Sequence, residues 1–166
     1  MSIVNQLIQR YGLEPHPEGG WYKQTYKSNE QIVAEALPKR FIASRVFSTA
    51  IYFLLEKGNF SAFHRIKSDE CWHFYAGEPL FIYIIEQTGE LKIISLGNDH
   101  EKGQSFQYVV PSYCWFASCP APGSEYCFVG CTVSPGFEFE DFELADVTEL
   151  SLVYPRHKSI IIELCL

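Results

Sequence analysis

The residues best suited to chemistry lie in one stretch, residues 58–77, with the sequence GNFSAFHRIKSDECWHFYAG. His64 precedes Glu70 by six residues, and a glycine stands at each end. A neutral imidazole oriented by a carboxylate can accept or deliver a proton near pH 7. The same pair can ligate a metal, but one imidazole and one carboxylate hold a divalent transition metal only weakly. The stretch allows acid–base chemistry or weak metal binding, and a hydrogen-bonded pair without activity is the structural alternative.

A proton-transfer site also needs an opposing acid, and two tyrosines are candidates. Tyr52 lies on a face of an expected strand that also carries Ser48. Tyr22 follows the loop at residues 13–20, LEPHPEGG. We expect Tyr52 to complete the catalytic set with the imidazole and the carboxylate.

The LEPHPEGG loop has two possible roles. Its prolines restrict the backbone, and Gly19 and Gly20 allow close approach by a ligand or a neighbouring strand. We expect a structural role for these glycines. His16 and Glu18 either cap the mouth of a pocket or fix the path of the N-terminal arm, and the sequence leaves both roles open.

Alternation along the expected strands predicts the walls of a pocket. Successive side chains of a strand point to opposite faces, so Ile66 shares the face of His64. By the same rule Trp72 and Phe74 share the face of Glu70. A pocket of aromatic residues with one or two polar groups suits a planar or sugar-like ligand, whereas the alternative is an aromatic core filled by its own side chains. The residues expected to bind the ligand are Tyr22, Arg45, Ser48, Ile66, Trp72, Phe74 and Phe116.

Charged residues outside this stretch suggest further roles. A guanidinium suits phosphate or carboxylate, and Arg45 is the better candidate for an anionic ligand. Arg65 points away from the pocket by parity, and we expect it to pair with Asp69. The acidic residues at 138–143 alternate with phenylalanines, which fits an amphipathic strand or arm better than a calcium site.

Short strands separated by turn-forming residues predict an all-β sandwich or closed barrel. One amphipathic helix is expected between Ser2 and Gly12, and Asp146 with Glu149 resembles the capping box of a second short helix that Pro155 ends. The expected strands are residues 21–27, 46–55, 61–66, 71–75, 80–86, 91–96, 105–110, 115–118 and 126–133.

The composition fits a single folded domain over residues 1–166. Hydrophobic residues make up 47% and aromatic residues 16%, which excludes a disordered chain. The net charge of −7 argues against a nucleic-acid or anionic-membrane partner, because both require clustered Lys and Arg. No signal peptide or membrane span is visible, so we expect a cytoplasmic protein in which the six cysteines are thiols.

Several motifs resemble the DUF985 or Cupin-5 branch of the cupin superfamily. The framework Gly58-x5-His64…Glu70-x6-Gly77 resembles the first conserved cupin motif. This resemblance implies a double-stranded β-helix, or jelly roll, that forms a homodimer. The other matching stretches are residues 13–26, LEPHPEGGWYKQTY; 48–55, STAIYFLL; 109–116, VVPSYCWF; and 133–144, VSPGFEFEDFEL.

The chain departs from the resembled pattern at three positions. Metal-binding cupins carry a second histidine where this chain has Ile66, and a further one at or near Phe116. We therefore expect no metal or other cofactor, and a divalent metal at His64 and Glu70 remains the minority alternative. Tyr113 stands where the family has glycine, which predicts an altered turn or a strained backbone.

The leading functional hypothesis is a cupin that binds a small molecule in its barrel. The ligand is expected to be a sugar phosphate, a nucleotide or another small polar or aromatic metabolite. The alternative is a sugar isomerase or epimerase in which His64 and Glu70 carry out the proton transfer. A metal-dependent oxygenase ranks below both, and a structural or storage role is the remaining possibility.

Overall fold

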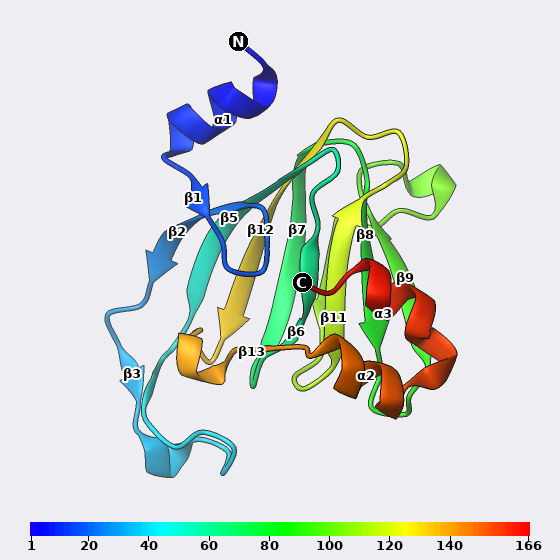
Figure 1. The fold of residues 1–166 in the computed structure, drawn as a ribbon. Helices are drawn as coiled ribbons and strands as arrows, with labels where there is room; N and C mark the ends of the chain where they lie inside the picture. Colours follow the sequence, from blue (N-terminus) through cyan, green and yellow to red (C-terminus); the bar gives the residue numbers. More distant parts are fainter.

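Two antiparallel sheets face each other in the computed structural model, which describes residues 1–166 (Figure 1). The first sheet has the strand order β1-β2-β5-β12-β7-β10, and the second has the order β13-β6-β11-β8-β9. A small third sheet pairs β3 with β4. The strands are β1 (Glu14–Pro15), β2 (Trp21–Lys27), β3 (Gln31–Ile32), β4 (Arg45–Val46), β5 (Thr49–Glu56), β6 (Ser61–Arg65), β7 (Asp69–Gly77), β8 (Leu80–Ile85), β9 (Leu91–Leu96), β10 (Gln107–Val110), β11 (Trp115–Pro120), β12 (Tyr126–Ser134) and β13 (Glu143–Leu144).

The all-β prediction with a short helix near each end is confirmed. Ser2 caps the first helix, and Gly12 ends it in the left-handed conformation with φ 61°. Asp146 caps the second helix by accepting hydrogen bonds from two backbone N–H groups. The sequence patterns did not predict the third helix. The helices are α1 (Ile3–Tyr11), α2 (Val147–Val153) and α3 (Lys158–Glu163), and short 3-10 helices span Ala34–Ala36, His100–Lys102, Phe139–Asp141 and Pro155–His157.

The interior between the sheets is apolar along most of its length and polar at one end. Trp72 is 1% exposed and packs against Phe53 and Phe116. Two residues earlier on the same face of β7, Glu70 lies opposite Val133 of β12. Because β7 carries both residues inward, its start places a carboxyl group at the edge of the core.

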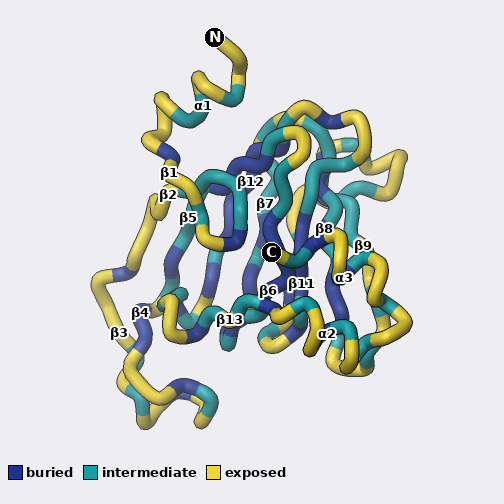
Figure 2. Tube along the Cα trace, viewed as in Figure 1, coloured by how far each residue is buried: buried dark blue, intermediate teal, exposed yellow.

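The outer faces of the two sheets are covered differently. The helices α2 and α3 pack on the second sheet, where Leu150 and Ile161 join Phe63 in a buried cluster. On the first sheet α1 packs against Leu54 and Phe128 of the outer face, and this helix is largely exposed (Figure 2). None of the helices is both long enough and apolar enough to span a membrane.

The structure corrects the prediction of which face of β5 points into the interior. Tyr52 was expected to point inward, but it packs on the outer face with Leu54 and Phe128, where its ring lies 5.0 Å from that of Tyr11 in α1. Apolar side chains occupy both faces of this strand, so its pattern alone could not show which face meets the interior. The residues of β5 that point inward are Thr49, Ile51, Phe53 and Leu55.

Tyr113 adopts the left-handed backbone conformation that favours glycine, with φ 63°. Its N–H donates to the carbonyl of Ile66 at 2.9 Å. The neighbouring N–H of Ser112 donates to the carboxylate of Asp69 at 2.8 Å. The expected strain at this turn is therefore present, and the two hydrogen bonds hold the turn beside β6 and β7.

Candidate functional site

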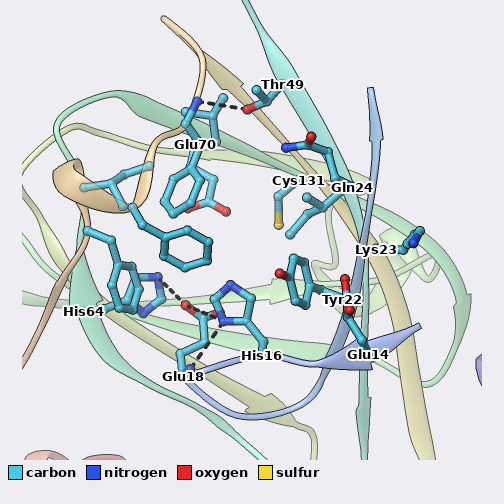
Figure 3. A pocket seen from close by; sticks show the side chains of 16 residues that line it. Glu14, His16, Glu18, Tyr22, Lys23, Gln24, Thr49, His64, Glu70 and Cys131 are labelled. Carbon is cyan, nitrogen blue, oxygen red and sulfur yellow. Dashed lines mark hydrogen bonds and ion pairs between the residues drawn. The ribbon is translucent and has the colours of Figure 1, made fainter. Parts of the chain in front are cut away.

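A cavity of about 410 Å³ lies at the polar end of the interior (Figure 3). Its walls come from the β1–β2 hairpin, from the inward faces of β5, β7 and β12, from the end of β6, and from a segment after β12. The lining residues are Glu14, His16, Glu18, Tyr22, Lys23, Gln24, Thr49, Ile51, His64, Ile66, Glu70, Cys131, Val133, Phe137, Phe139 and Phe142.

The LEPHPEGG loop inserts two polar side chains into this cavity. It forms the turn between β1 and β2, where Glu14 pairs with Tyr22. Gly19 has φ 110°, and a Cβ there would lie 2.1 Å from the carbonyl oxygen of Phe60, so a side chain cannot be accommodated. This close approach brings Glu18 inside the barrel, where only 6% of it is exposed.

Glu18 is the centre of a buried hydrogen-bond network. Its Oε2 lies 3.1 Å from Nε2 of His64, and its Oε1 accepts a hydrogen bond from the hydroxyl of Ser61 at 2.9 Å. The other ring nitrogen of His64, Nδ1, lies 2.7 Å from the carbonyl oxygen of Ala62. Since a carbonyl can only accept, Nδ1 of His64 carries a proton.

The pKa shifts of Glu18 and His64 favour a proton on the carboxyl group in this contact. Burial raises the pKa of Glu18, and this increase is only partly offset by the charge of His16 and the hydrogen bond from Ser61. Burial also lowers the pKa of His64, and the charge of Glu70 only partly opposes this. Both directions favour a neutral pair, in which the Glu18 carboxyl donates to Nε2 of His64.

His16 presents the opposite tautomer to the cavity. The backbone N–H of Glu18 donates to Nδ1 of His16 at 3.3 Å, so this nitrogen is unprotonated. The neutral ring then carries its proton on Nε2. Burial is the main cause that lowers the pKa of His16. Its ring meets Tyr22 edge-on, with 4.6 Å between the ring centres.

Glu70 is a buried carboxyl group that faces the cavity without an ion-pair partner. It is 8% exposed, and the thiol of Cys131 is its hydrogen-bonding neighbour. Burial raises the pKa of Glu70 to about 7, with His64 lowering it and Glu18 raising it further. Glu70 therefore exchanges its proton near neutral pH, which is the condition for general acid–base work.

Three phenylalanines form the apolar wall of the cavity. Phe137, Phe139 and Phe142 belong to what we call the phenylalanine segment, residues 136–142, between β12 and β13. Their rings meet edge-to-face, with centres 5.1 to 6.3 Å apart. The acidic side of this segment was expected to be an amphipathic strand or arm; it is an arm with a 3-10 turn at Phe139–Asp141.

Arg45 anchors the phenylalanine segment and does not face the cavity. It is 1% exposed, and its Nε and Nη2 donate to the carboxylate of Asp141, each at 2.7 Å. Glu140 adds a second carboxylate 2.6 Å from Nη2. The hypothesis that Arg45 binds an anionic ligand is corrected, because its guanidinium is already satisfied within the chain.

Some of the other expected site residues line the cavity. His64, Glu70, Tyr22 and Ile66 do so. Tyr52 lies on the far side of the first sheet and is not among the lining residues.

The remaining expected ligand-binding residues lie outside the cavity. The hydroxyl of Ser48 donates to the carbonyl of Val133 at 3.1 Å. Trp72, Phe74 and Phe116 belong to the apolar interior, which supports the alternative of a self-filled aromatic core for that part of the barrel.

Arg65 points outward as expected but has a different partner. It forms a two-pronged contact with Glu143 of β13, at 2.7 and 3.0 Å, and lies 4.4 Å above the ring of Trp115. Asp69, the expected partner, accepts a backbone hydrogen bond instead. The pairing of β6 with β13 explains the difference, because it sets Glu143 directly beside Arg65.

The side chains present do not fit the metal site of metal-binding cupins. Both ring nitrogens of His64 are engaged, one by Ala62 and one by Glu18. Ile66 and Phe116 offer no ligand atoms where further histidines would be needed. No group of three or more His, Cys, Asp or Glu side chains is arranged to hold an ion.

Two parts of the cavity could not be assigned from the sequence. The roles of His16 and Glu18 stayed open, although the paired glycines after them signalled a close backbone approach. The phenylalanines at 137–142 were not assigned to the site, since their alternation with acidic residues predicts an amphipathic strand or arm and does not show what that element packs against.

Comparison with known proteins places the chain in one family. The model of the Cupin superfamily (DUF985) family, Cupin_5, matches residues 5–145. The chain is 30% identical over 149 residues to the "Uncharacterized protein YML079W" of Saccharomyces cerevisiae, covering 84% of this chain and 74% of the yeast protein.

Solved structures agree with the family assignment. Protein SO0799 from Shewanella oneidensis has a TM-score of 0.89 and 38% identity, covering 100% of this chain and 99% of its own. A hypothetical protein from Leishmania major has a TM-score of 0.86 and 32% identity, covering 97% of each chain. Oxalate decarboxylase from Bacillus subtilis, at 14% identity and a TM-score of 0.55 over 90% of this chain and 36% of its own, shares the fold alone. The motifs, the paired sheets and the family match agree, and the chain belongs to the Cupin_5 (DUF985) family of the cupin superfamily.

Proposed function

We propose that this protein binds a small metabolite in the cavity between its two sheets. The observation that carries the proposal is Glu70, a buried carboxyl group that faces the cavity with a thiol as its hydrogen-bonding neighbour. A carboxyl group has acceptor sites on both oxygens, so one thiol neighbour leaves sites at which a ligand can supply further hydrogen bonds.

The free polar groups of the cavity suggest how a ligand is held. Three polar groups are free to contact a ligand: the hydroxyl of Tyr22, Nε2 of His16 and the carboxyl of Glu70. Of these, Glu70 alone has a hydrogen-bonding side chain beside it, the thiol of Cys131. Phe137, Phe139 and Phe142 supply an apolar wall on which a flat face can lie. A sugar phosphate or nucleotide has less support than the sequence suggested, because Arg45 is sequestered.

A metabolite library tests this proposal by thermal shift. We expect at least one compound to raise the melting temperature of the wild-type protein and to lose that effect in Glu70→Gln, which keeps the shape of the side chain. Glu101→Gln is the matched control, since Glu101 is exposed and distant from the cavity. If no compound shifts the wild type, or if Glu70→Gln keeps every shift, the proposal fails.

A proton-transfer isomerase or epimerase is the second candidate function. It is favoured by the pKa of about 7 at Glu70, beside the neutral Glu18–His64 pair. In this scheme ionised Glu70 removes a proton from a carbon next to a carbonyl, a neutral group opposite donates its own proton to that carbon, and exchange with solvent restores both groups. Tyr22 takes the place of Tyr52 as the opposing acid, because Tyr22 lines the cavity.

Solvent exchange distinguishes this enzyme from a binding protein. Aldoses and ketoses incubated with the wild type in deuterated water should gain deuterium at one carbon, and Glu70→Gln should abolish the gain. His73→Gln provides a control on the opposite face of β7, where His73 bonds to Thr132. Exchange that persists in Glu70→Gln would assign the proton transfer to another group.

We also propose that the chain forms a homodimer through the outer face of its first sheet. Tyr75 is 50% exposed there, and its ring lies 5.8 Å from Tyr52 and 6.0 Å from Phe128. A large aromatic side chain exposed on an apolar sheet face is typical of an interaction surface. Light scattering should give a dimer for the wild type and for Ile93→Glu on the other sheet, but a monomer for Tyr75→Glu; a dimeric Tyr75→Glu would exclude this face.

A further inference from the structure

The cavity contains acidic groups without a matching cation. Glu14, Glu18 and Glu70 all line it, and Lys23 is the one Lys or Arg among the lining residues. The side chain of Lys23 points away from the centre of the cavity (Figure 3). Arg45, which the sequence suggested as the residue for an anionic ligand, is held by Asp141 and Glu140. An anionic ligand would therefore meet carboxyl groups with no cation to offset them.

Among these acids, Glu70 is the buried one left for a ligand, since Glu14 is exposed to solvent. Glu18 is occupied by Ser61 and His64, as described above. Glu70 is 92% shielded from solvent by the fold, yet no Lys or Arg pairs with it. A buried carboxylate without a partner is unfavourable, so a positive group that enters the cavity would be stabilised by it.

The wall formed by the phenylalanine segment favours the same ligand class. A cation is attracted to the face of an aromatic ring, and the attraction is larger where water is excluded. Phe137, Phe139 and Phe142 line the cavity from one segment, and Tyr22 lines it from β2. Aromatic faces combined with a buried carboxyl group are the elements of a receptor for organic cations.

We propose that the ligand is a small organic cation, an ammonium or amidinium compound, whose charge pairs with Glu70 and whose apolar part lies against the phenylalanine segment. This inference rests on the proposed binding function and narrows it to one charge class. The cavity of about 410 Å³ has room for a cation with a single ring. The net charge of −7 also favours the approach of cations over anions.

Three probes of one shape and different charge test the inference: benzylammonium, benzyl alcohol and benzoate. Binding is measured by calorimetry at pH 8 and low salt on the full-length protein. We expect benzylammonium to bind about tenfold more tightly than benzyl alcohol, and benzoate to bind most weakly. Glu70→Gln should reduce benzylammonium to the affinity of the alcohol, while Glu101→Gln should leave the ranking unchanged.

The possible results distinguish the proposed cationic ligand from the proposed metabolite binding. If benzyl alcohol or benzoate binds as tightly as benzylammonium, the charge class is overturned while metabolite binding stands. If benzylammonium prevails but Glu70→Gln retains the preference, the role of Glu70 is overturned. If none of the three binds up to about 10 mM, the cation proposal fails, and the metabolite library decides separately whether the cavity binds anything.

Discussion

Oε2 of Glu18 lies 3.1 Å from Nε2 of His64, which joins the N-terminal hairpin to β6 inside the barrel. The contact couples two residues that are 46 positions apart and belong to separate sequence motifs. It explains why His64 is unavailable as a metal ligand, and it leaves Glu70 as the buried carboxyl group that a ligand can reach. The site is thus built around a neutral acid–imidazole pair and a second, separate acid.

The first prediction concerns the protonation of the histidines in the cavity. At pH 7 we expect His64 to be neutral with its proton on Nδ1, and His16 to be neutral with its proton on Nε2. Long-range proton–nitrogen NMR correlations distinguish these tautomers directly. Glu18→Gln should leave His64 in the same form, because the amide can also donate to Nε2. Two protonated nitrogens on His64 would instead indicate an ion pair with Glu18.

The second prediction concerns the pH dependence of stability. Glu70 has its pKa raised from 4.5 to about 7 in the folded protein, where His64, Glu18 and Cys131 face it. Below pH 4.5 the group is protonated in both folded and unfolded chains, so Glu70→Gln should change stability little. As the pH rises from 4.5 through 7, the unfolded chain ionises Glu70 before the folded protein does, so the wild type loses the stability that the neutral buried carboxyl supplied.

The difference between 4.5 and about 7 corresponds to about 3 kcal/mol. We therefore expect Glu70→Gln to be more stable than the wild type at pH 8 by up to about that amount. Urea unfolding at pH 4.5, 6 and 8 measures the difference. A constant difference across this range would contradict a raised pKa at Glu70.

The third prediction tests the anchor of the phenylalanine segment. Asp141→Asn leaves the buried Arg45 without its principal partner, and we expect a loss of about 3 kcal/mol in the free energy of unfolding. Glu138→Gln is the control on the same segment; its ion pair with Lys27 is exposed and should be worth less than about 1 kcal/mol. Equal losses in the two variants would show that the Arg45 pair does not anchor the segment.

The fourth prediction concerns the strained turn at Tyr113. A left-handed conformation costs a residue with a side chain roughly 1–2 kcal/mol, and the greater freedom of glycine in the unfolded chain offsets part of this. We expect Tyr113→Gly to raise the free energy of unfolding by about 0.5–1 kcal/mol. Tyr113→Ala removes the ring but keeps the strain, so it should not stabilise. An equal gain in both variants would attribute the effect to the ring.

Strand positions were predictable because turn residues and alternating apolar residues are local signals. The alternation rule also predicted which side chains around His64 and Glu70 face inward. Ile66 lines the cavity with His64, and His73 faces the other way. Parity failed at β5, where α1 covers the outer face and makes both faces apolar. Which of the two faces points inward depends on the element that packs on the outer face, and the sequence of the strand itself does not show this.

By itself the sequence determined the family, the strands and the pair of residues at positions 64 and 70, because each of these is written in short segments. The tertiary structure decided which acid contacts His64 and which aromatic residues line the cavity. It also decided that Arg45 forms a buried ion pair and does not face the cavity. Those relationships join Glu18 to His64, Arg45 to Asp141, and residues 137–142 to the mouth of the barrel. They arise from packing between distant segments, where burial and hydrogen bonding select partners that spacing along the chain does not specify.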